Sequence, residues 1–365
     1  MKLSILTSVL KEEPAYRDLK ESVERKVAEE KAQIQSSGIP MVISSLGRDV
    51  GVCVLVVVPL PNDAIELKEQ IEIWNDGHCE VMLFPEVETL AFEKQDADAI
   101  TIQQRLSVLR ALSQKTLNVE STNRDLPIIV IASVAALTKK TIHKGIYNAY
   151  TGTMRRGDRI DIEALLDQWR LMGYQFDTTV FDSGYVSRRG GIIDIFPIGH
   201  EAPSRIELWD NEIESIRKFD PFTQLSTQVV DVIEISPAHE VLPGLIPIEL
   251  WESKISTLDM GSNGDIDGRV QKELDEILDG TKTDDFDFYS GLFCDGSLID
   301  YFPLDSLQIL SRPSEIFDAV REIDSRVDQL RVAKELRGEI LKKFPSPSMD
   351  CEKLELELGL SLIHI

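Results

Sequence analysis

The sequence predicts an α/β protein in which a doubly wound parallel sheet carries an inserted small α+β domain. Within residues 37–147, short runs of β-branched residues alternate with helical segments. Within residues 148–238 the pattern changes to short strands separated by tight turns, and helical pattern returns in residues 239–345. Strands that alternate with helices are typical of parallel β-α-β units, whereas strands joined by tight turns are typical of antiparallel sheets.

The first part of the main domain follows a charged helical segment at residues 1–36. Val52–Pro59 has the length and composition of a fully buried strand. Asn62 and Asp63 are residue types that favour helix N-caps, so we expect a helix to begin there. The strands predicted in this part are Pro40–Ser44, Val52–Pro59, Val81–Pro85 and Ile128–Ser133, and the helices are Ala64–Trp74, Ala99–Leu112 and Val134–Leu137.

The inserted domain, residues 148–238, begins with a short helix predicted at Asp161–Met172. Arg205–Trp209 and Glu212–Pro221 alternate apolar and charged residues on either side of the two-residue turn Asp210–Asn211. This pattern predicts an exposed β-hairpin. A small sheet that displays charge on one face favours docking over catalysis.

The remainder of the main domain, residues 239–345, contains a short strand candidate at Ser306–Leu310. We expect this third segment, residues 239–345, to fold back on the first domain, and a long charged helix is predicted within it at Pro313–Leu341. Its apolar face consists of Ile316, Val320, Ile323 and Val327. Residues 346–359 are interpreted as the start of a linker. Residues 360–365 resemble a translated sequencing adapter, so we exclude them and expect the natural chain to continue past about Gly359.

Composition excludes several classes of function. The chain has 39 basic and 63 acidic residues, a net charge of −24, which repels a phosphate backbone and argues against autonomous DNA binding. The 4 cysteines and 5 histidines show no metal-ligand spacing, so we expect no metal site and a reducing, cytoplasmic setting. The longest apolar run, Val50–Leu60, is too short to span a bilayer, so no membrane partner is expected.

Several ordered motifs resemble the UvrB/Mfd family of bacterial DNA-repair proteins. The motifs are Phe84–Leu90, Gln104–Leu106, Ile129–Val134, Asp194–Pro197, Arg205–Glu207, Asp220–Gln224 and Pro237–Glu240. The resemblance implies a helicase-like first domain and a second domain that interacts with the repair protein UvrA. It also implies a bacterial, cytoplasmic protein.

The nucleotide motifs of that family are degenerate here. The resemblance places a P-loop at Ser44–Asp49, yet this segment has one glycine, no lysine, and an Asp that would repel phosphate. The Walker B position follows the strand Gln308–Leu310, and no acidic pair stands there. We therefore expect no catalytic residues and no ATPase activity in this chain, with weak nucleotide binding through Arg48 as the alternative. The predicted degenerate site consists of Ser44, Gly47, Arg48, Ser311 and Arg312.

The resemblance also implies the docking residues. Arg189, directly before a glycine, matches a family arginine that binds UvrA, while Ser187 and Gln175 replace two others. Arg188 is an additional cation that can substitute, because a guanidinium pairs bidentately with carboxylates. The predicted UvrA-binding set is Arg188, Arg189, Ile193 and Tyr185. Core packing is the alternative role for Ile193, and a solvated surface pair is the alternative for the arginines.

Within the family, the degenerate motifs favour the N-terminal UvrB-like module of transcription-repair coupling factors. The resemblance implies that such a module recruits UvrA to RNA polymerase stalled at DNA lesions. ATP, magnesium, RNA polymerase and double-stranded DNA would then belong to motor and C-terminal domains absent from this chain. Two alternatives stay open: a UvrB-like ATP-dependent damage-recognition protein, and a UvrA-binding adaptor without a motor.

Overall fold

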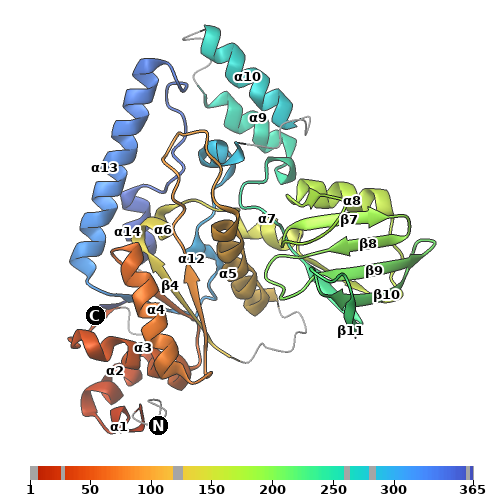
Figure 1. Ribbon diagram of the computed structural model, residues 1–365. Coiled ribbons are helices and arrows are strands. Elements are labelled where there is room, and N and C mark those ends of the chain that lie inside the picture. Colours follow the sequence, from red (N-terminus) through yellow and green to blue (C-terminus); the bar gives the residue numbers. More distant parts are fainter. Residues whose placement is uncertain are drawn as a thin grey trace.

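Two sheets organise the chain in the computed structural model, which describes residues 7–25, 29–117, 126–258, 264–278, 285–358 and 362–364. Figure 1 shows the first sheet in the central lobe, a helical lobe above it and a β-rich lobe to the right. The first sheet is parallel throughout, in the order β1-β14-β13-β2-β4-β3. Its strands are β1 (Glu29–Lys31), β2 (Val54–Val58), β3 (Glu80–Phe84), β4 (Ile128–Ser133), β13 (Leu307–Leu310) and β14 (Leu362–His364).

Strand β2 shows why this sheet is covered on both faces. Its five residues are all apolar and all buried. Leu55 and Val57 pack into one hydrophobic cluster, while Val54 and Val56 pack into another on the opposite face. A parallel sheet needs helices on both faces because its strands are apolar on both sides. The predicted doubly wound α/β fold is therefore confirmed.

Helices from distant parts of the chain supply the two layers. One layer consists of α2 (Pro14–Glu24), α3 (Ile39–Val50) and α4 (Pro61–Asn75). The other consists of α5 (Ala99–Leu117), α6 (Val134–Thr138), α12 (Leu298–Tyr301), α13 (Pro313–Arg337) and α14 (Cys351–Leu358). Because β13 pairs with β2, the third segment returns to the first domain as expected.

The strand predicted at Pro40–Ser44 is wrong, because these residues lie in helix α3. Pro40 occupies the first turn, where a proline costs no hydrogen bond. Val42, Ile43 and Leu46 pack on the sheet at helical spacing. Gly51, at φ 76°, ends the helix in the left-handed conformation that glycine favours. A short apolar run is ambiguous between strand and helix, and the periodicity settles it only with the flanking residues.

Two further expectations need correction. Helix α4 begins at Pro61, and its N-cap residue, Leu60, makes no side-chain capping bond, so Asn62 and Asp63 lie inside the first turn. The linker predicted at 346–359 contains helix α14, whose Leu354 and Leu358 are fully buried. Two leucines four residues apart form an apolar stripe that the surrounding charges obscure in the sequence. Leu362–His364 forms β14, whereas residues 359–361 and 365 lie outside the described residues.

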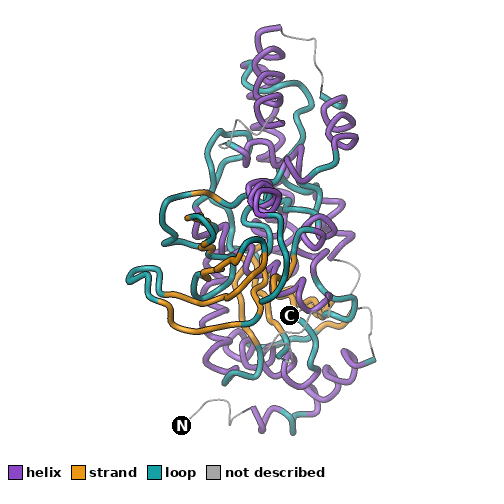
Figure 2. The backbone as a smooth tube through the Cα atoms, turned by 90° about the vertical axis from the view of Figure 1, so that its right-hand side faces the viewer, coloured by secondary structure: helices purple, strands orange, loops and turns teal. Residues whose placement is uncertain are grey.

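The β-rich lobe contains a six-stranded sheet in the order β11-β10-β9-β8-β7-β6. All neighbours are antiparallel except β6 and β7. Its strands are β6 (Gln175–Phe176), β7 (Tyr185–Arg189), β8 (Ile192–Ile195), β9 (Ser204–Trp209), β10 (Glu212–Phe219) and β11 (Ser226–Val230). Helix α8 (Ile162–Leu171) lies along β7, and β5 (Gly152–Arg155) pairs with β12 (Val232–Ile235). Figure 2 views the molecule from this side.

Two-residue turns join β7 to β8 and β9 to β10 in this sheet. The predicted hairpin is confirmed, because Trp209 pairs with Glu212 across the turn Asp210–Asn211. Arg189 likewise pairs with Ile192 across Gly190–Gly191, and Gly190 has φ 62°. Such turns need positive φ at a central residue.

The helical lobe has its own core, formed around Trp251, Tyr289 and Phe344. Phe92, from the loop between β3 and α5, enters this core and stacks edge-on against Phe344. The lobe contains η3 (Pro243–Leu245), α9 (Ile248–Ser256), α10 (Gly264–Leu278), η4 (Phe286–Tyr289) and α11 (Ser290–Phe293). The remaining short elements are α1 (Thr7–Leu10), η2 (Ser36–Gly38) and α7 (Lys144–Ala149).

A buried carboxylate holds the N-terminal helices against α3. Asp49 accepts hydrogen bonds from Tyr16 (3.1 Å) and Arg48 (2.8 Å), and Lys11 lies 3.0 Å from it. Burial alone would raise the pKa of Asp49, but the hydrogen bonds from Arg48, Lys11 and Tyr16 outweigh it and lower the pKa. A depressed pKa means that the charged form stabilises the fold, so this stabilisation is lost as the pH falls through the folded value.

Asp49→Asn is therefore expected to lower the free energy of unfolding by about 1–3 kcal/mol at neutral pH. The variant should also lose less stability than the unmodified chain as the pH falls into the carboxyl range. Urea unfolding across that range, followed by circular dichroism, measures both effects. Asp18→Asn, at an exposed position of α2, is the matched control. Identical pH profiles for Asp49→Asn and the unmodified chain would contradict this account.

Candidate protein-docking face

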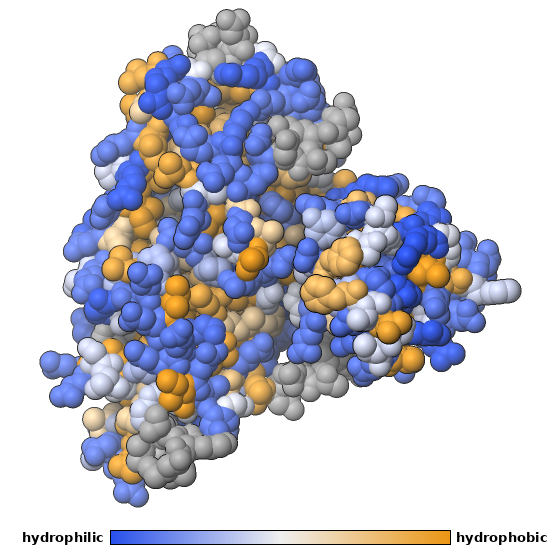
Figure 3. Space-filling view, in the orientation of Figure 1, coloured by the Kyte–Doolittle hydropathy of each residue, from blue (hydrophilic) through white to orange (hydrophobic). Residues whose placement is uncertain are grey.

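The inserted sheet has one buried and one open face, set by the alternation of its strands. The buried face consists of Val186, Ile193, Ile195, Ile206, Ile213 and Ile216. The cross-strand register places Arg189, Ile192 and Glu207 in one row of the opposite face, and Asp194, Arg205 and Arg217 in the next. Figure 3 shows hydrophilic and hydrophobic residues interspersed over the surface of this lobe. We call the open face, with these residues, the outer face.

A buried carboxylate organises the arginines of the outer face. Asp194 is 1% exposed and accepts a bidentate pair of hydrogen bonds from Arg205, at 2.7 and 2.9 Å. Arg189 donates to the same carboxylate at 2.7 Å, yet its side chain remains 55% exposed. Arg205 also stacks on the Phe219 ring, 4.7 Å from its centroid. Asp194 thus fixes Arg205 within the sheet and holds Arg189 at the surface with part of its guanidinium open to solvent.

Arg188 points the other way. It pairs with Glu163 on α8 at 2.6 Å, and its Nε donates to the Gly190 carbonyl at 3.3 Å. Neighbouring residues of a strand project to opposite faces, so the two arginines do not form the single cationic patch that their adjacency suggests. The candidate contact of the outer face is Arg189.

The other two predicted docking residues differ in outcome. Ile193 is fully buried in the core, so its assignment to partner binding is wrong and its alternative role in packing is correct. Tyr185, at the start of β7, is half-buried. The sequence analysis did not select three exposed apolar residues: Ile192 (36%), Trp209 (76%) and Val229 (63%). The sequence could have indicated Trp209, because it lies two and four residues after Glu207 and Arg205 in the same strand and therefore projects to the same face.

Comparison with known proteins bears on this lobe directly. The family model described as the UvrB interaction domain matches residues 153–241. The chain is 26% identical over 288 residues to the transcription-repair-coupling factor of Escherichia coli, covering 76% of this chain and 24% of that protein. It is 30% identical to the transcription-repair-coupling factor of Bacillus subtilis, covering 67% of this chain and 21% of that protein.

The chain is a relative of the transcription-repair-coupling factors and carries a UvrB interaction domain. The factor of Myxococcus xanthus is 32% identical over 162 residues, 44% of this chain and 13% of that protein. The chain spans about a quarter or less of the length of these relatives. The relationship supports the predicted UvrB-like N-terminal module. The domain limits predicted from the sequence stay predictions.

Helix α5 fixes the UvrB interaction domain against the first lobe. Arg110 and Gln114 both donate to Glu234 on β12, at 2.9 and 2.7 Å. Arg105 makes a fully buried bidentate pair with Glu240, just beyond β12. The outer face therefore has a defined orientation relative to the parallel sheet.

The five residues of the predicted degenerate nucleotide site do not lie together in this relative of the coupling factors. Ser44 and Gly47 lie within α3 and are buried, and Arg48 lies at its C-terminal end. Helix α3 leads into the amino end of β2, whereas Ser311 and Arg312 follow the carboxyl end of β13. Opposite edges of a parallel sheet cannot hold one ligand, so the grouping of these five residues is wrong. The cause is the helix that replaces the predicted strand at Pro40–Ser44.

Ligands of open α/β sheets bind at the carboxyl ends of the strands, so we considered which residues lie at that edge of the parallel sheet. Pro59 and Leu60 connect β2 to Pro61, the first residue of α4, so the connection contains no glycine and both prolines lack an N–H. Arg312 forms ion pairs with Asp63 and Glu315 at this edge. The two prolines remove N–H groups that could otherwise bind a phosphate, and two carboxylates already pair with the Arg312 guanidinium.

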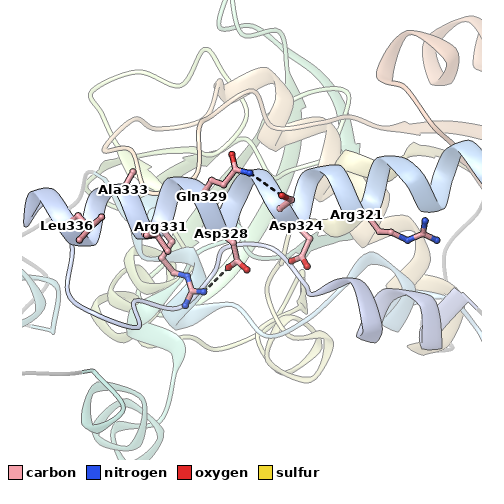
Figure 4. A pocket seen from close by; sticks show the side chains of 9 residues that line it. Arg321, Asp324, Asp328, Gln329, Arg331, Ala333 and Leu336 are labelled. Carbon is pink, nitrogen blue, oxygen red and sulfur yellow. Dashed lines mark hydrogen bonds and ion pairs between the residues drawn. The ribbon is translucent and has the colours of Figure 1, made fainter.

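A shallow pocket lies along the exposed side of α13, where Asp328 pairs with Arg331 at 2.7 Å and Gln329 donates to Ser325 at 3.2 Å (Figure 4). These contacts within one helix stabilise its solvent-facing side. Among the described residues, no cluster of His, Cys, Asp and Glu could hold a metal ion. No helix in the described part of the chain is long and apolar enough to cross a membrane.

Proposed function

We propose that this chain recruits UvrA through the outer face of its UvrB interaction domain, in transcription-coupled repair within the bacterial cytoplasm. The observation that carries the proposal is the exposed Arg189 guanidinium, held at 2.7 Å by the buried Asp194 in a domain matched as a UvrB interaction domain. Preorganised arginines beside exposed aromatic and aliphatic side chains have the composition of protein-interface hot spots.

In this proposal, docking needs only charge and shape complementarity from this chain. RNA polymerase and double-stranded DNA are then bound by parts of the coupling factors that lie beyond the matched region. ATP and magnesium act in those parts as well. The role of the chain is to place UvrA where polymerase has stalled at a lesion.

Arg189→Ala is expected to weaken UvrA binding at least about tenfold, because Arg189 is more exposed than the other outer-face arginines, Arg205 and Arg217. The fold should survive, since Asp194 keeps its bidentate bond from Arg205. Arg188→Ala should have a smaller effect, because that side chain pairs with α8. Isothermal titration with purified UvrA measures the affinities, and thermal unfolding monitors the fold.

Arg321→Ala is the matched control, an arginine of α13 that is 61% exposed and paired with Asp318 at 3.0 Å. It should bind UvrA as the unmodified chain does. Unchanged affinity in the Arg188→Ala/Arg189→Ala double variant would show that the docking face lies elsewhere.

A further inference from the structure

The last residue of β5 and the loop that joins this strand to α8 carry three exposed arginines within five residues: Arg155, Arg156 and Arg159. We call residues 155–160 the arginine loop. None of the three side chains forms an ion pair or a hydrogen bond with any residue that the structure describes. The other arginines of the domain each pair with a carboxylate: Arg170 with Asp167, Arg188 with Glu163, Arg189 and Arg205 with Asp194, and Arg217 with Glu207. Among the described residues, the unpaired arginines of this domain are therefore concentrated in one loop.

The carboxylates in and directly after the loop, Asp158 and Asp161, accept hydrogen bonds from backbone N–H groups. Asp158 accepts a hydrogen bond from the Arg155 N–H at 2.6 Å, and Asp161 caps α8 by accepting from Ala164 at 3.2 Å. The loop is also fixed to β10, because Gly157 donates to the Ile213 carbonyl at 2.8 Å. A cationic loop that is already held in place loses little conformational entropy when a partner binds.

The arginine loop continues the outer face. Arg159 forms an isolated bridge with Glu212, and Glu212 pairs with Trp209. Residues paired in this way share one face of the sheet, so Arg159 lies on the same side as Trp209, which is 76% exposed. The Leu208 N–H donates to the Gly191 carbonyl at 2.8 Å, which places the Gly190–Gly191 turn beside Trp209. Arg189 directly precedes that turn.

We infer that the arginine loop and Trp209 form a second contact area for UvrA, one that binds an apolar pocket bordered by carboxylates. This inference rests on the proposed function and names the chemistry of the partner surface. We place carboxylates on the UvrA surface because the three guanidinium groups have no ion-pair partner within the described chain and would be complemented by negative charge. We place an apolar pocket on UvrA because Trp209 is a large exposed aromatic side chain, and aromatic anchors of interfaces fill cavities on the partner.

The surroundings of the loop favour a protein over a nucleic acid. Exposed Asp210, Glu212 and Asp231 lie next to the arginine loop, so the described surface alternates in charge and does not form the continuous basic stripe that a phosphate backbone needs. The net charge of −24 acts in the same direction. Interleaved charges around an aromatic centre are instead the composition of a protein interface.

Replacing Arg155, Arg156 and Arg159 together by Ser tests the loop in the intact chain. We expect the association rate with UvrA to fall about tenfold at low salt, and the difference to shrink at high salt, because rim charges steer association and are screened. Trp209→Ala should mainly raise the dissociation rate, by about tenfold or more. Stopped-flow association and biosensor dissociation measure the two rates.

Replacing Arg321, Arg326 and Arg337 by Ser removes the same charge from exposed positions of α13 and controls for net charge. Thermal unfolding confirms that each variant folds. If the arginine-loop and Trp209 variants keep unmodified rates while Arg189→Ala weakens binding, the inference fails and the proposed function stands. If the unmodified chain does not bind UvrA, both fail. A labelled DNA duplex that binds the unmodified chain and not the loop variant would overturn the choice of a protein partner.

Discussion

Arg105→Met is expected to lower the free energy of unfolding by about 3–5 kcal/mol, because it leaves a buried carboxylate without its partner. Arg105 is fully buried, and its Nε and Nη2 donate to Glu240 at 2.5 and 3.0 Å. Its guanidinium also covers the Phe84 ring at 3.9 Å and donates to the Pro85 carbonyl at 3.0 Å. Methionine can fill much of the space but cannot compensate the charge of Glu240.

The double variant Arg105→Met/Glu240→Leu should recover most of the lost stability, since replacing both members of a buried pair by apolar residues is often neutral. Urea unfolding of the two single variants and the double variant gives the coupling energy. Arg110→Met is the control, because its partner Glu234 also accepts from Gln114 and the pair is less buried. An Arg105→Met variant as stable as the unmodified chain would contradict this reasoning.

The sequence predicted correctly those elements whose local residue pattern allows only one kind of secondary structure at the observed burial. The run of β-branched residues at Val54–Val58 can be buried only as a strand covered on both faces, and the structure places it at the centre of the sheet. The turn at Asp210–Asn211 fixed the register of its hairpin locally. Helix α3 was missed because its apolar residues form too short a run to distinguish the two periodicities.

The candidate site was less predictable because it depends on which face of a sheet is covered. Adjacency of Arg188 and Arg189 suggested a common patch, yet α8 pairs with only one of them. Ile193 was assigned to partner binding with core packing as the alternative, and the register of the sheet places it in the core. The ion pairs of Asp194 and the unpaired arginine loop depend on tertiary contacts between distant segments, which no local pattern encodes.

Asp194 gives the sharpest test of how the core supports the outer face. Asp194→Ala is expected to destabilise the chain by about 2–3 kcal/mol, because it leaves Arg205, whose side chain is 18% exposed, without its bidentate acceptor. It should also weaken UvrA binding about tenfold, since Arg189 loses the group that holds it in place. Asp182→Ala, at an exposed position of the same lobe, should change neither quantity.

Asp194→Asn separates positioning from stability, because the amide retains one acceptor oxygen for Arg205 while the charge that holds Arg189 is removed. We expect this variant to melt closer to the unmodified chain than Asp194→Ala does, yet to bind UvrA with similarly reduced affinity. Adding Arg189→Ala to Asp194→Asn should then reduce affinity little further, since both changes remove the same contact. Fully additive losses in this double-mutant cycle would show that Arg189 docks independently of Asp194. The buried carboxylate would then support only the fold of the lobe.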